Sequence, residues 1–261
     1  MTFDDLIDDP KKEEEKTEAF LGYIDSEDKS QGGAGEEKLS GPLTAAPQAI
    51  RARQQSCMIK DLDPDEVPEF WKELEAGGGQ RKPKLTTKEI LKKDTEDEAL
   101  QRYKRALLGD LADESKFTGE PPLVEFLKIE ILCPERPDGP IRLEFSDSKK
   151  AGVYKTQEYV LKQKSSIQMR VTFKVYNDIV QGLKLCTVVK KTGFVVEKGD
   201  EVLGTFAPVP SREYVIDLQP DETPGGFMAR GQYTGKALFI DNDGIVHHQF
   251  DYKFNIKKTW D

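Results

Sequence analysis

Apolar residues alternate with polar ones along most of the chain after Leu123, and this period of two constrains the fold more than any other feature. Residues 167–175 and 250–256 show the pattern most clearly, with an aliphatic or aromatic side chain at every second position. Such alternation is typical of antiparallel strands with one buried and one solvated face. Further strands are expected at 127–132, 141–145, 159–161, 183–189, 193–196, 202–206, 214–218 and 229–239.

Turn signals rather than helical patterns separate these strands. The clearest is Asp241-Asn-Asp-Gly244, which predicts a tight hairpin. Many short strands with Pro, Gly and Asp between them indicate an all-β fold, and we predict an immunoglobulin-like β-sandwich over residues 121–261.

The negative charge lies in the first half of the chain. Residues 1–120 contain 29 Asp and Glu against 19 Lys and Arg, whereas residues 121–261 contain 19 against 20. Acidic blocks and Gly-rich or Pro/Ala-rich stretches bury too little apolar surface to offset the entropy of ordering them. We therefore expect 1–84 to be an acidic disordered extension. Its apolar islands at 19–23 and 67–74 are either recognition helices that fold on a partner or transient helices without one.

Residues 85–120 carry helix signals that agree with one another. Two capping boxes, each a Thr followed three residues later by a Glu, predict helices at about 87–93 and 96–108. The second helix has one apolar stripe, formed by Leu100, Tyr103, Leu107 and Leu108. We expect this region to be a helical regulatory arm that docks on another surface.

Composition excludes several classes of protein. Three cysteines, Cys57, Cys133 and Cys186, fit neither a disulfide framework nor a metal-ligand spacing, which favours a reducing compartment. The N-terminus is acidic where a secretory signal is basic, and no apolar run is long enough to span a bilayer. The acidic balance argues against nucleic acid. A cytoplasmic protein without stable membrane insertion is expected.

An enzyme is not expected, nor is a cofactor or a metal. His247 and His248 are adjacent on a predicted strand, so their side chains face opposite sides and, without a bulge, cannot share a metal ion or serve one nucleophile. We interpret them as surface or rim histidines. The glycine-rich residues 32–38 lack the Gly-Lys-Ser/Thr spacing of a phosphate-binding loop.

The chain resembles the Rho GDP-dissociation inhibitors in several separate segments. Together they cover roughly residues 85–261, in the order in which the family has them, and leave 1–84 uncovered. The matching segments are DEALQRYKRALLG at 97–109, IVQGLK at 179–184, FMARGQY at 227–233, FIDND at 239–243 and IKKTW at 256–260.

The resemblance implies a binding protein with two functional parts. The helical arm would lie on the switch regions of a Rho-family GTPase and oppose nucleotide release. The sandwich would take the geranylgeranyl or farnesyl group of the prenylated GTPase between its sheets and so extract the GTPase from membranes. Burying a lipid chain is worth roughly 0.8 kcal/mol per CH₂, so only an equally apolar slot can accept it.

Site residues follow from the same matching. Asp97, Tyr103 and Asp243 correspond to positions that contact the GTPase, although Asp97 could simply complement a helix dipole, Tyr103 could pack and Asp243 could be a turn residue. The prenyl slot would be lined by Ile131, Tyr159, Ile167, Ile179, Met228, Gly235, Phe250 and Tyr252, each of which could also be plain core.

Two departures from the family concern the slot. Phe250 and Tyr252 stand where tryptophans are usual, and Gly235 stands where a branched aliphatic residue is common. The preferred prenyl length is therefore open. Two alternatives remain, a carrier of other lipidated cargo and an adhesion or scaffold sandwich with a solid core.

Overall fold

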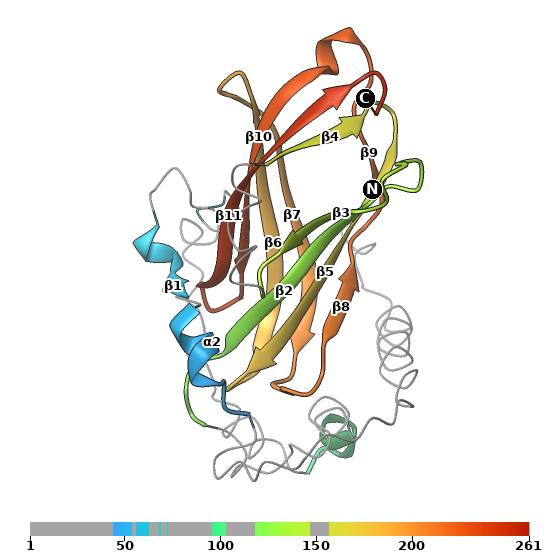
Figure 1. Ribbon diagram of the computed structural model, residues 1–261. Helices are drawn as coiled ribbons and strands as arrows, with labels where there is room; N and C mark the ends of the chain where they lie inside the picture. The colour runs from blue at the N-terminus through green and yellow to red at the C-terminus, as the bar shows by residue number, and fades with distance from the viewer. Residues whose placement is uncertain are drawn as a thin grey trace, which may run out of the picture. The chain divides into compact units, whose positions relative to one another are not determined.

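The computed structural model describes residues 44–53, 56–62, 68, 72, 96–102, 118–146 and 157–260. Within them the chain forms two facing β-sheets, which confirms the predicted immunoglobulin-like β-sandwich (Figure 1). The strands are β1 (Cys57–Met58), β2 (Leu123–Leu132), β3 (Ile141–Glu144), β4 (Glu158–Lys162), β5 (Ser166–Tyr176), β6 (Val180–Lys191), β7 (Phe194–Phe206), β8 (Tyr214–Asp217), β9 (Asp221–Glu222), β10 (Gly231–Ile240) and β11 (Ile245–Lys257). Short helical elements accompany them, among them α2 (Gln48–Arg53) and the 3₁₀ turns η1 (Ile59–Asp61) and η4 (Phe227–Ala229). No helix in the described part of the chain is long and apolar enough to cross a membrane.

The first sheet has the order β1-β11-β10-β6-β7, with β4 parallel to β11, and the second has the order β3-β2-β5-β8, with β9 beside β5. Strand β7 is continuous, whereas the sequence predicts two strands interrupted at the charged residues 197–201. The long strand β6 pairs with β7 across this stretch, so the ladder hydrogen bonds override the weak local propensity. The two-residue strand β9 was not expected.

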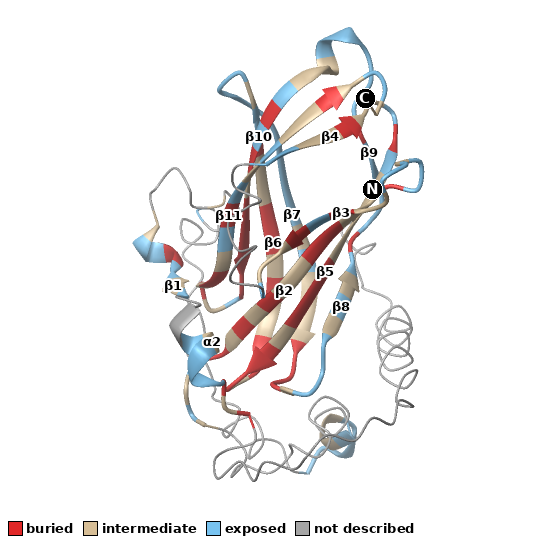
Figure 2. Ribbon diagram, viewed as in Figure 1, coloured by how far each residue is buried: buried red, intermediate tan, exposed pale blue. Residues whose placement is uncertain are grey.

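Aromatic side chains fill one half of the space between the sheets. The ring centroids of Phe126 and Phe239 are 4.3 Å apart, and Phe173 lies 4.9 Å from Phe206 and 5.6 Å from Tyr214. Buried residues follow the inward faces of β2, β5 and β6 in this half (Figure 2). Farther along the same strands the inward residues are mostly aliphatic, and the packing there leaves a cavity.

Residues 44–53 and 56–62, which we call the N-terminal strap, pack on the sandwich. Strand β1 pairs with the start of β11, and the amide of Ile59 donates to the carbonyl of Gly244 at 2.8 Å. The Ile59 side chain is 3% exposed and lies in a cluster with Cys186, Leu238, Ile240 and Val246. Nearer the N-terminus, the carbonyl of Thr44 accepts from the amide of Asn177 at 2.7 Å.

The strap lies inside the range 1–84, where composition predicts disorder, and that expectation does not hold for it. Composition misses the strap because the surface that buries Ile59 comes from strands more than a hundred residues later in the chain. The islands 19–23 and 67–74 lie almost entirely outside the described residues.

Candidate functional site

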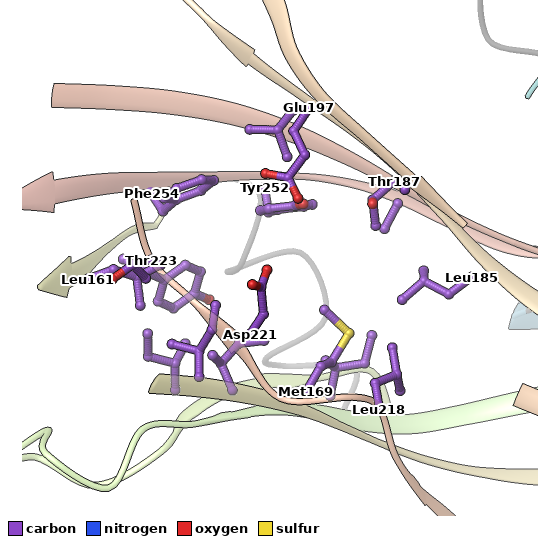
Figure 3. Close-up of a pocket in the computed structure, with 18 of the residues that line it drawn as sticks. Leu161, Met169, Leu185, Thr187, Glu197, Leu218, Asp221, Thr223, Tyr252 and Phe254 are labelled. Carbon is purple, nitrogen blue, oxygen red and sulfur yellow. The ribbon is translucent and has the colours of Figure 1, made fainter. Parts of the chain in front are cut away.

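A cavity of about 340 Å³ lies between the two sheets, beyond the aromatic half of the core. Figure 3 shows side chains from both sheets pointing into it, with Tyr252 and Thr187 on one side and Met169 and Leu218 on the other. Its apolar lining consists of Ile129, Ile131, Ile141, Leu143, Tyr159, Leu161, Ile167, Met169, Leu185, Val189, Leu218, Pro224, Ala237, Phe250, Tyr252, Phe254 and Ile256. Such a space suits a flexible hydrocarbon group rather than a polar ligand.

The polar residues of the lining are mainly acidic. Five carboxylates come from β7 and β9, namely Glu197, Asp200, Glu201, Asp221 and Glu222, and the neutral polar residues are Thr187, Gln219 and Thr223. The amide of Gln219 donates to Oε1 of Glu201 at 2.9 Å, which links the two sheets beside the cavity. The cavity therefore combines an apolar interior with a negatively charged rim.

Tyr252 forms part of one wall, and Gly235 lies behind its ring. They are direct cross-strand partners, and a Cβ added to Gly235 would lie 2.1 Å from Cζ of the Tyr252 ring. The ring thus occupies the space that a side chain at position 235 would need. Burial, with a smaller contribution from Glu197, raises the pKa of Tyr252 to about 12, so its hydroxyl is neutral at physiological pH.

Five of the eight residues predicted for the slot line the cavity: Ile131, Tyr159, Ile167, Phe250 and Tyr252. The other three do not. Ile179 is buried but precedes Val180, which pairs with Phe206 in the aromatic half. Met228 is 84% exposed in the η4 turn, and Gly235 lies behind the ring of Tyr252.

Sequence reasoning missed a larger set of lining residues. Ile129 and Met169 share the inward faces of Ile131 and Ile167, so the period of two could have identified both. Thr187 and Glu197 carry no such signal, because both are polar residues in strands whose burial depends on the facing sheet.

Asp97 begins a helical segment whose described part ends at Arg102. Its Oδ1 accepts a hydrogen bond from the amide of Leu100 at 3.0 Å, which is the geometry of an N-cap. The predicted helix 87–93, the end of the predicted helix 96–108 and Tyr103 lie outside the described residues. Asp97 therefore caps the N-terminus of this helix whether or not it also contacts a partner.

Asp243 lies in the turn between β10 and β11, which confirms the predicted hairpin. The neighbouring Asp241 organises this turn. Its Oδ1 accepts from the amides of Asp243 and Ile245, each at 2.9 Å, while its Oδ2 lies 3.0 Å from Nε2 of His247. A buried carboxylate thus fixes the backbone that presents Asp243.

His247 is neither a surface nor a rim residue, contrary to expectation. The side chains of His247 and Asp241 are both fully buried. His248 is half-buried, with its ring centroid 4.8 Å from that of Phe145 and 5.5 Å from that of Phe126. The hairpin and the facing sheet cover these positions, which strand periodicity alone cannot reveal.

Together the fold and the cavity define a β-sandwich binding protein that is hollow at one end. A family model described as RHO protein GDP dissociation inhibitor matches residues 71–259. The chain is 31% identical over 177 residues to the Rho GDP-dissociation inhibitor of Schizosaccharomyces pombe, covering 68% of this chain and 84% of that protein. It is 35% identical over 179 residues to Rho GDP-dissociation inhibitor 1 of Arabidopsis thaliana, covering 68% and 72%, and 32% identical over 174 residues to Rho GDP-dissociation inhibitor 1 of Homo sapiens, covering 66% and 81%.

The chain therefore belongs to the Rho GDP-dissociation inhibitor family. The family match begins at residue 71, so the N-terminal strap precedes it.

Proposed function

We propose that this chain is a cytoplasmic regulator of Rho-family GTPases that sequesters their prenyl group, extracts them from membranes and slows GDP dissociation. The observation that carries the proposal is the apolar cavity of about 340 Å³ between the sheets. A sandwich with a solid core would not contain it. The family name describes an inhibitor, and we propose no catalytic role for the cavity.

The lining supports a geranylgeranyl or farnesyl group as the ligand. Ile131, Tyr159, Ile167, Phe250 and Tyr252 offer hydrocarbon from both sheets. Transfer of the lipid from a bilayer is then a transfer between two apolar environments, so it loses little of the roughly 0.8 kcal/mol per CH₂ that burial provides. The Tyr252 side chain is neutral, so it adds no charge to the cavity wall.

The GTPase itself would be held by Asp97, Tyr103 and Asp243. The N-cap bond uses one oxygen of Asp97, and the carboxylate can still accept a hydrogen bond from a partner. Asp243 lies on a turn that Asp241 makes rigid, which lowers the entropy lost on binding.

Filling the cavity tests the prenyl assignment. In Ile167→Trp the larger side chain enters the space intended for the lipid, and we expect extraction of a prenylated Rho-family GTPase from liposomes to fall at least tenfold. Binding of the unprenylated GTPase should stay unchanged. Val215→Trp introduces the same side chain at an exposed position of β8 and serves as the control. Equal extraction by both variants, with both folded, would show that the cavity does not receive the prenyl group.

A pair of isosteric substitutions that remove charge tests the GTPase contacts. Asp97→Asn keeps a good N-cap residue, so together with Asp243→Asn it removes charge with little effect on folding. We expect affinity for unprenylated GTPase to fall about tenfold for each lost hydrogen bond to a charged group. Asp138→Asn, at a 78% exposed side chain, is the control. Unchanged affinity in titration calorimetry would leave the two aspartates as a cap and a turn residue only.

A further inference from the structure

Five large apolar side chains are exposed at one end of the sandwich. Phe194, Val195 and Val196 begin β7 and are 75%, 48% and 53% exposed, while Phe227 and Met228 in η4 are 82% and 84% exposed. We call these five residues the apolar tip. Exposed apolar groups that gather in this way mark surfaces for interaction, whereas single ones need no explanation.

The two segments of the apolar tip are neighbours in space. Lys191 is the cross-strand partner of Phe194, and its Nζ donates to the carbonyl oxygens of Met228 at 2.5 Å and Arg230 at 2.7 Å. The loop before β10 and the connection between β6 and β7 are both exposed in Figure 2. Lys191 therefore holds η4 against the β6–β7 hairpin.

The cationic side chains of Lys164, Lys191 and Arg230 lie beside η4. The stem of Lys164 lies beside Gly225, where an added Cβ would come within 2.6 Å of its Cε. Nε of Arg230 donates to Oε1 of Gln163 at 3.0 Å, and Lys190 is exposed next to Lys191. Residues 121–261 as a whole are near neutral, with 19 Asp and Glu against 20 Lys and Arg.

The acidic residues nearest in sequence, Glu197, Asp221 and Glu222, line the cavity. Lys164, Lys191 and Arg230 thus lie beside the apolar tip, with Lys190 on the outer face of the same end of β6, and the negative groups belong to the lining of the cavity. Tyr233 connects the two regions, because its ring stacks 4.9 Å from that of the cavity residue Phe254 and lies 4.9 Å from Nζ of Lys191.

We propose that the apolar tip, with Lys164, Lys190, Lys191 and Arg230, is a peripheral docking surface for an anionic phospholipid bilayer. Phe and Met side chains gain by entering the interface between headgroups and acyl chains, and Lys and Arg are attracted to anionic headgroups. The combination of apolar and cationic groups at one place matches the chemistry of such a membrane. The idea that docking brings the cavity close to a prenyl group rests on the proposed function. The docking of the apolar tip on a bilayer does not rest on it.

Vesicle binding by the full chain alone tests this proposal. Sucrose-loaded vesicles of phosphatidylcholine, with or without phosphatidylserine, are sedimented with the protein. We expect binding only to vesicles that contain phosphatidylserine, and a loss of roughly tenfold or more in partitioning for the double variant Phe194→Ser, Phe227→Ser. The double variant Lys164→Gln, Lys190→Gln should lower the partitioning onto vesicles about fivefold for each charge removed.

The control is Val215→Ser, which removes a 38% exposed apolar side chain from the other sheet and should bind vesicles as the parent does. All substitutions are at exposed positions, so melting temperatures should change little. Failure of the parent to bind anionic vesicles, equal binding to both vesicle types, or undiminished binding by the double serine variant would each overturn the proposal.

GTPase extraction by the same proteins separates the two hypotheses. Extraction without vesicle binding by the protein alone would reject the docking surface and leave the prenyl assignment standing. Vesicle binding by the parent, combined with undiminished GTPase extraction by Ile167→Trp, would support the docking surface and reject the prenyl assignment.

Discussion

Gly235 and Tyr252 depend on each other at the level of single residues. Each is a departure from the family pattern, and taken separately the two suggest a slot of altered width. In the structure they are cross-strand partners, and the Tyr252 ring occupies the space that a side chain at position 235 would need. The ring covers the glycine and forms the cavity wall. The width of the slot here is set by the tyrosine.

Gly235→Ala should therefore be destabilising. The added Cβ would lie 2.1 Å from the Tyr252 ring, and forcing such a contact in a packed region costs about 1–3 kcal/mol. In a Tyr252→Ala background the same substitution should be neutral or stabilising by about 0.4–1 kcal/mol, since it then only restricts the unfolded chain. Urea denaturation of the four proteins measures both effects. Equal effects of Gly235→Ala in the two backgrounds would refute the pairing.

The N-terminal strap shows, at the level of elements, what local patterns can and cannot predict. The strand alternation of β5 and β11 and the hairpin at Asp241–Gly244 are local signals, so the sequence predicts them correctly. The strap, the continuity of β7 and the strand β9 depend on partners distant in the chain. The cavity is a similar case, because alternation tells which residues face inward but not whether they fill the space.

Removing residues 1–43 should leave the stability of the sandwich unchanged, whereas removing residues 1–62 should lower it. The longer deletion takes away the β1 pairing and the buried Ile59, and Ile59→Ala alone should cost about 2–4 kcal/mol. Arg51→Ala is the control, because its ion pair with Glu120 is well exposed and is worth less than about 1 kcal/mol. The measurement is the free energy of unfolding in urea. Identical values for the two deletions would mean that the strap contributes nothing.

Two ion-pair sites link the strands of the second sheet and make the stability of the whole molecule depend on pH. Arg142, together with Lys128, holds the pKa of the nearly buried Glu130 below its ordinary value of 4.5. Arg170 binds both oxygens of Asp217, at 2.6 and 2.8 Å, and holds its pKa below 3.8. Folded-state pKa values that are lowered stabilise the protein above the unfolded values, and this stability is lost as pH falls through the lowered ones.

Unfolding free energy should accordingly decline as pH drops below about 4.5, and Glu130→Gln should decline less than the parent. At neutral pH the variant starts lower, because Arg142 and Lys128 lose their charged partner. Urea denaturation at neutral pH and at about pH 3 gives the difference in unfolding free energy between parent and variant at each pH. A parallel decline of parent and variant would show that Glu130 is not a source of the acid sensitivity.

The aromatic half of the sandwich is filled with side chains and the other half contains the cavity, and strand β5 passes through both. In the filled half Val171, Phe173 and Val175 are fully buried, and in the hollow half Ile167 and Met169 face the cavity. Side chains in the filled half are surrounded by partners, so removing their atoms leaves a new void. Around the cavity some of those partners are already absent. Stability should therefore come mainly from one half and binding capacity from the other.

This division predicts an inversion of the usual order of substitution costs. Ile167→Ala removes more hydrocarbon than Val175→Ala, yet we expect the smaller loss at Ile167, below the roughly 2–5 kcal/mol typical of Ile→Ala in a solid core. The free energy of unfolding in urea, measured without a lipid ligand, compares the two variants. Saturating prenylated peptide should widen the difference between parent and Ile167→Ala, because ligand binding stabilises the folded state and the variant binds less tightly. A cost at Ile167 above that at Val175 would mean that the region around the cavity is packed as tightly as the core.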